Sequence, residues 1–125
     1  MASTGPTREE VFQVEAALSS VDGDEDLLLE IVDLFLESYP KLVSAMKEAV
    51  AKCDAPALMR SAHSLKGSVG YFGASRALEA VLKLEQMGHE DNWSRVGSGL
   101  GQLEDALEEL GPALIGLTNE LKRSA

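Results

Sequence analysis

The chain has 125 residues, of which 45% are hydrophobic and 26% charged, which fits one globular domain with a buried core. Eleven Lys and Arg against 21 Asp and Glu give a net charge of −10, which disfavours binding to nucleic acid. No apolar run is long enough to span a bilayer, and the single cysteine, Cys53, excludes an internal disulfide. We therefore expect a cytoplasmic protein that binds neither nucleic acid nor membrane.

The N-terminal part of the sequence predicts a short helix. Residues 1–6 are small or polar and are expected to form a disordered leader, so we expect the helical domain over residues 7–123. The run Thr7-Arg8-Glu9-Glu10 has the pattern of a capping box, which predicts the start of this helix. Asp22-Gly23 marks the turn after it, and Asp24 is suited to cap a second helix.

The second predicted helix is long. Apolar residues recur in it at steps of four and three, namely at Leu28, Val32, Phe35, Tyr39, Leu42, Met46 and Ala49. Pro40 removes one backbone donor, but the pattern continues through it, so we predict a bend and not an end. Asp54 as N-cap and Pro56 in the first turn predict the start of a third helix, which Gly73 ends.

Two more helices are predicted after Gly73. Ser75 to Met87 forms the fourth, with Gly88 as its stop and with an inner side made of Leu78, Val81, Leu82 and Glu85. From Trp93 to Leu121 the spacing of apolar residues survives Gly111-Pro112, which favours one kinked helix over two. No strand pattern is visible. The sequence predicts an all-α fold, an up-and-down antiparallel four-helix bundle with a short extra N-terminal helix.

The third predicted helix carries a histidine away from its apolar side. Its apolar stripe consists of Leu58, Ala62, Leu65, Val69 and Phe72. At roughly 100° per residue, His63 lies about 140° from the centre of this stripe, so its imidazole is expected in solvent. Gly67 and Gly70 lie on the same side, although each costs a helix roughly 1 kcal/mol relative to alanine. Because glycine has no Cβ, we interpret this side as a docking face with a nucleophile at its centre.

The charge around this histidine is reversed relative to the whole chain. Between Ala55 and Leu78 there is no Asp or Glu, whereas Arg60, Lys66 and Arg76 are positive. Lys66 follows His63 by one turn and is expected to neutralise an anion held on Nε2 of the imidazole. The pattern predicts an acidic partner or a phosphoryl group. The partner-contact residues that we expect are Met59, Arg60, Gly67, Gly70 and Arg76.

The string AHSLKGSVGYFGA, from Ala62 to Ala74, resembles the signature of histidine-containing phosphotransfer (HPt) domains. The resemblance implies a phosphocarrier of a two-component multistep phosphorelay, a phosphotransfer intermediate and not an enzyme. It implies that His63 accepts a phosphoryl group from a receiver-domain aspartyl phosphate and passes it to another receiver. Lys66 is then the charge partner and Gly67 the clearance residue, while Gly70 matches more loosely. We expect a monomer without a cofactor, with Mg²⁺ on the receiver.

Two alternatives remain open from the sequence. Tyr71-Phe72-Gly73 is also similar to the N-terminal phosphotransfer domain of chemotaxis histidine kinases, in which a kinase domain with ATP would be the donor. A helical protein-interaction module without phosphorylation is an alternative of another class. His89 is interpreted as a surface residue, because no metal-binding pattern surrounds it. Gly97, Gly99 and Gly101 follow no predicted strand and lack the lysine of a P-loop, so nucleotide binding is disfavoured.

Overall fold

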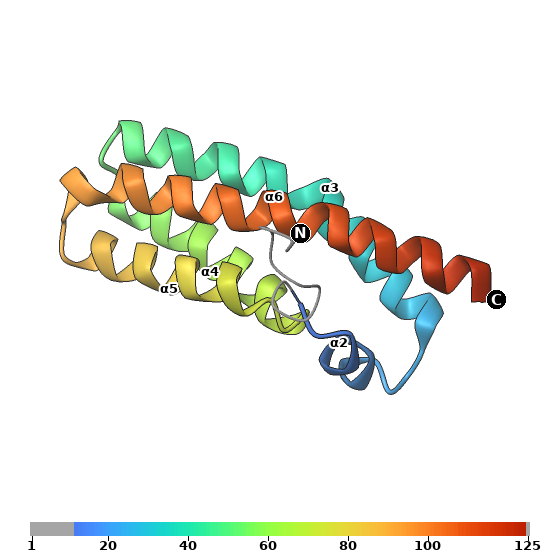
Figure 1. Ribbon diagram of the computed structural model, residues 1–125. Helices are drawn as coiled ribbons and strands as arrows, with labels where there is room; N and C mark the ends of the chain where they lie inside the picture. The colour runs from blue at the N-terminus through green and yellow to red at the C-terminus, as the bar shows by residue number, and fades with distance from the viewer. Residues whose placement is uncertain (1–11, 125) are drawn as a thin grey trace, which may run out of the picture.

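The computed structural model describes residues 12–124, and every regular element within that range is a helix. The helices are α2 (Val14–Ser20), α3 (Glu25–Ala51), α4 (Ala55–Tyr71), α5 (Ser75–His89) and α6 (Trp93–Ser124). Figure 1 shows α3 to α6 side by side as an elongated up-and-down bundle, with short α2 at one end. The predicted all-α bundle with a short extra helix is confirmed. The expected leader at residues 1–6 and the Thr7–Glu10 capping box lie outside the described residues.

The four long helices form a closed ring of neighbours. Each packs against the next along the chain, and α6 packs back against α3. As a result α4 contacts α3 and α5, while α6 lies diagonally across the core from it (Figure 1). The core side chains of α4 are Leu58, Ala62, Leu65 and Val69, all fully buried, which is the predicted stripe.

Aspartate N-caps begin α3 and α4, and a left-handed glycine follows α4, where the sequence indicates. Asp24 Oδ1 accepts a hydrogen bond from Leu27 N at 3.1 Å, and Asp54 Oδ1 accepts one from Ala57 N at 3.1 Å. Cys53, in the turn between α3 and α4, has a φ of 50°. Gly73 follows α4 with a φ of 63°, a conformation that glycine adopts without steric cost. Both predicted N-caps and the predicted end of α4 are confirmed.

Two of the four prolines of the chain lie in the interior of long helices. Pro40 is within α3 and Pro112 within α6, and each helix is continuous through its proline. The prediction of one continuous helix from Trp93 to the end of the apolar pattern is confirmed.

The first helix starts later than its sequence pattern indicates. Gln13 is extended, with φ −112° and ψ 107°, and its N–H donates to Phe72 O at 3.0 Å. Phe12 is fully buried, so its side chain belongs to the core and not to a helix face. A helix that runs from the Thr7–Glu10 box through residues 12 and 13 is therefore wrong, because neither residue is helical and the N–H of Gln13 pairs with the end of α4.

The inner face of α5 also differs from the prediction. Its buried residues are Ala77, Val81, Leu84 and Gly88, whereas Leu82 is 47% exposed and Leu78 is only half-buried. Gly88 does not stop the helix, which continues to His89. A Cβ at Gly88 would lie 3.4 Å from Leu58 Cδ2 and from Met59 Sδ. Gly88 therefore allows α5 to pack closely on α4. The side of α5 that faces the core includes small residues, Ala77 and Gly88, which a search for large apolar residues misses.

The glycines of the α6 start have separate explanations. A Cβ at Gly99 would lie 3.0 Å from Met87 Sδ, so Gly99 permits close packing on α5. A Cβ at Gly97 or Gly101 would meet no atom of the described chain within 4 Å. The run is therefore part of a helix with one packing glycine, and not a phosphate loop.

Candidate functional site

The site is built on α4. Asp54 caps its first turn, Pro56 lies at the helix start, and the buried stripe fixes its rotation about its own axis. With that rotation fixed, His63 is exposed, as predicted. No hydrogen bond or ion pair joins its ring to another residue of the 12–124 range. The imidazole is therefore open to a reacting group from outside the bundle.

Bare backbone lies beside the imidazole. Gly67 and Gly70 are exposed, and a Cβ built at either position would have no described atom within 4 Å apart from the neighbouring backbone of α4 itself. Neither glycine is therefore required for packing inside the bundle. The two positions leave a strip of helix with no side chain next to the histidine, which a partner surface can approach closely.

Lys66 is placed differently from the free cation that the sequence indicates. Its Nζ lies 3.2 Å from Glu85 Oε1 and 3.3 Å from Glu85 Oε2, so it forms an ion pair between α4 and α5. The Lys66 side chain is 33% exposed and that of Glu85 only 15%. Lys66 thus lies at the α5 edge of the face, already held by a carboxylate. Sequence reasoning placed Glu85 on the inner side of α5 but did not pair it with Lys66.

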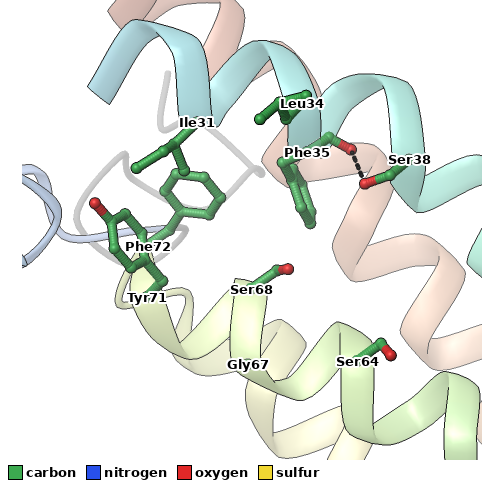
Figure 2. Close-up of a pocket in the computed structure, with 9 residues that line it drawn as sticks. All are labelled: Ile31, Leu34, Phe35, Ser38, Ser64, Gly67, Ser68, Tyr71 and Phe72. Atoms are coloured by element: carbon green, nitrogen blue, oxygen red, sulfur yellow. Dashed lines mark hydrogen bonds between the residues drawn. The ribbon is translucent and has the colours of Figure 1, made fainter. Parts of the chain in front are cut away.

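A groove between α3 and α4 borders the other edge of the face (Figure 2). It has a volume of about 420 Å³, and it is lined by Ile31, Leu34, Phe35 and Ser38 of α3 and by Ser64, Gly67, Ser68, Tyr71 and Phe72 of α4. Figure 2 shows Ile31 and Phe35 extending from α3 toward α4 across the groove. Gly67 belongs to both the groove and the histidine face, so the two surfaces are continuous.

The apolar side chains that α3 contributes to the groove were not predicted as site residues. Leu34 is 64% exposed and Leu27 is 41% exposed, so α3 presents more than one large aliphatic side chain to solvent, and it is such a group, not a single leucine, that indicates an interaction surface. Leu27, Ile31 and Leu34 recur at steps of four and three along α3, beside the core stripe. This second apolar stripe is the signal that a sequence analysis can use to find the surface. Tyr71 lines the same groove, and its hydroxyl is buried without a hydrogen-bond partner among the described residues.

The other predicted contact residues are divided between two faces. Arg60 is exposed on α4, and Met59 is half-buried, close to Gly88 of α5. Arg76 lies on α5, where its NH1 group donates to Glu109 Oε2 of α6 at 3.2 Å. Met59, Arg60, Gly67 and Gly70 thus lie on α4 with His63, whereas Arg76 lines a polar groove between α5 and α6.

Within residues 12–124 no group of three or more His, Cys, Asp or Glu side chains is arranged to hold a metal ion. In the same range no helix combines the length and apolar character that crossing a membrane requires. What the α4 face presents is an exposed nucleophile, one neighbouring ammonium group and an unobstructed approach. This arrangement fits the acceptance of a group from a partner that brings its own catalytic machinery.

Comparison with known proteins defines the class. The family model of the Hpt domain matches residues 30–113, more than half of the chain, and the chain belongs to this family. It is therefore a histidine phosphotransfer carrier of two-component systems, a phosphotransfer intermediate whose family interacts with receiver domains. No match was found among curated proteins.

Two solved structures share the fold. Histidine-containing phosphotransfer protein B (HptB) from Pseudomonas aeruginosa PAO1 is 20% identical with a TM-score of 0.81, and the match covers 88% of this chain and 96% of that one. The HPT domain of an Hpt sensor hybrid histidine kinase from Shewanella is 18% identical with a TM-score of 0.76, covering 89% and 96%. At these identities the likeness shows the bundle architecture.

Proposed function

We propose that His63 is the phosphorylated residue, and that it accepts a phosphoryl group from the aspartyl phosphate of one receiver domain and passes it to the aspartate of another. The observation that carries this proposal is the exposed imidazole of His63 beside two glycines, Gly67 and Gly70. Packing within the described bundle does not require either residue to be glycine. Glycine at exposed helix positions costs about 1 kcal/mol each relative to alanine, so a reason outside the bundle is needed.

The transfer step needs no acid or base from this chain. The lone pair of His63 Nε2 attacks phosphorus and forms the P–N bond, while the P–O bond to the aspartyl oxygen breaks. The electron pair of that bond stays on the carboxylate, and the imidazole keeps its proton on Nδ1. Onward transfer is the reverse reaction with a second aspartate, and Nε2 regains its lone pair. Mg²⁺ belongs to the receiver in this scheme, and the chain acts as a cytoplasmic monomer without a cofactor of its own.

Docking combines the basic α4 face with the apolar α3–α4 groove. Arg60 is exposed on α4, in a stretch without carboxylates, and the charge of Lys66 is balanced by Glu85. Because the whole chain has a net charge of −10, an acidic receiver surface is repelled less by this face than by the rest of the molecule. Leu34 offers exposed apolar area beside Gly67, and burial of such area is the main source of binding free energy.

Labelling of the full chain tests the proposal. Receiver domains loaded with radioactive acetyl phosphate, an acyl phosphate like the aspartyl phosphate itself, are mixed with the chain, and acid-labile label on the chain is followed. His63→Gln should remove the label. The matched control is His89→Gln, which changes the other, exposed histidine and should keep it. Label retained on His63→Gln would refute the assignment.

A parallel incubation with a histidine kinase domain and ATP tests the chemotaxis-type donor. We expect label from the receivers and not from the kinase domain. If His63→Gln still binds a receiver that never labels the unmodified chain, the chain is an interaction module and the phosphocarrier proposal is wrong.

A further inference from the structure

The transfer step described above assigns no role to the ion pair between Lys66 and Glu85. It joins α4 to α5 through both carboxylate oxygens, at 3.2 and 3.3 Å from the same ammonium nitrogen. Glu85 is the less exposed partner, so its carboxylate has less freedom to turn away than the lysine has. Lys66 is the only cation that is paired with Glu85 among the described residues.

Phosphorylation changes the charge balance at this pair. Without a phosphoryl group, Lys66 and Glu85 neutralise each other. A phosphoryl group on His63 adds about −1.5 to −2 charges one helical turn from Lys66, where i and i+3 side chains are neighbours. The ammonium group then has two anions beside it, the phosphoryl group and Glu85. Since α4 contributes no Asp or Glu of its own, Glu85 is the carboxylate that competes.

Building on the function proposed above, we propose that Glu85 is a positioning residue that sets the transfer equilibrium: it holds Lys66 away from the phosphoryl group and keeps the phosphohistidine ready to pass that group on. The bonds made and broken are those of the transfer step, with the P–N bond of His63 broken and a P–O bond to the receiver aspartate formed. Glu85 acts on the relative free energy of the two phosphorylated states and does not touch phosphorus.

Removing this carboxylate should shift the equilibrium toward the histidine. In Glu85→Gln the side chain keeps its shape and loses its charge, so Lys66 is free to pair with the phosphoryl oxygens. We expect the ratio of phosphohistidine to receiver aspartyl phosphate to rise about tenfold, equivalent to about 1.4 kcal/mol. Lys66→Met should shift the same ratio toward the receiver. In the Lys66→Met background, the effect of Glu85→Gln should shrink to less than half.

The experiment uses the full chain and a receiver domain that labels the unmodified protein in the assay above. The ratio of the two phosphorylated species is measured at equilibrium, together with the melting temperature. The matched control is Glu79→Gln, an exposed carboxylate of the same helix that pairs with Lys83 and should leave the ratio unchanged.

Each outcome decides the proposal. A tenfold rise in Glu85→Gln alone, reduced when Lys66 is absent, supports it. A lower melting temperature with an unchanged ratio would mean that the pair only ties α4 to α5, and would overturn it. Equal shifts in Glu79→Gln and Glu85→Gln would also overturn it, because they would reflect net charge. If receivers that phosphorylate other Hpt domains never label the unmodified chain, the proposed phosphocarrier function is wrong. The proposed role of Glu85 is then wrong as well.

Discussion

Replacing Gly67 with leucine should stabilise the fold and strongly slow phosphoryl transfer to His63. Leucine has a helix propensity close to that of alanine, so the change favours α4 by about 0.8 kcal/mol. Beyond the helix's own neighbouring backbone, no atom of the described residues lies within 4 Å of a Cβ at Gly67, so the Cβ itself meets no clash that would offset this gain. For a domain of this size the melting temperature should rise by about 3 °C.

The same leucine places an isobutyl group next to the imidazole. Transfer requires phosphorus to come within about 3–3.5 Å of Nε2, and a displacement of about 1 Å costs on the order of 100-fold in rate. We therefore expect phosphoryl transfer from a receiver to fall at least about 100-fold, as measured by rapid-quench labelling. Thermal unfolding followed by circular dichroism measures the change in stability.

The matched control is Gly101→Leu, on the helix diagonally opposite α4. Gly101 is exposed and equally free of contacts within the described chain, so the gain in melting temperature should be the same and the transfer rate unchanged. If Gly67→Leu transfers at the unmodified rate, the glycine is not needed for approach. If Gly67→Leu unfolds at a lower temperature than the unmodified protein, a side chain at position 67 does clash with its surroundings, and the stability argument is wrong.

Three further changes test the fold and the groove. Gly73→Ala should destabilise the protein by about 2 kcal/mol or more, since φ is 63° and the new Cβ would lie 2.8 Å from Gln13 Cβ; urea unfolding measures it, and an unchanged midpoint would refute the close contact. Asp54→Ala should cost about 1 kcal/mol by removing the hydrogen bond to Ala57 N, with Asp54→Asn restoring most of it in the same assay. Leu34→Glu should change stability by less than about 0.5 kcal/mol, because the side chain is exposed, yet weaken receiver binding about tenfold in calorimetry; unchanged affinity would exclude the groove from the interface.

Local sequence signals were sufficient for α4 and its histidine. The capping carboxylate of Asp54, the stripe from Leu58 to Val69 and the left-handed Gly73 are short-range features, and each has its expected structure. Together they fix which way His63 points, so the exposure of the imidazole followed from spacing alone.

Features that depend on a neighbouring helix were not predictable in the same way. Leu82 and Leu84 are both leucines of α5, and the packing of α5 against α4 and α6 decides that Leu84 is buried and Leu82 is exposed. Likewise the partner of Lys66 lies 19 residues away on another helix. The sequence shows a lysine near the histidine, but which carboxylate faces it follows from the relative rotation of α4 and α5.

The turn before α4 offers a practical consequence. Cys53 is exposed and is the single thiol of the 125-residue chain, so a maleimide fluorophore reacts at one defined position without prior mutagenesis. Cys53 lies two residues before α4, and His63 lies about 12 Å along the helix axis from Ala55, the first residue of that helix. A dye attached there is joined to the end of the helix that carries His63, and its anisotropy would report receiver association in real time.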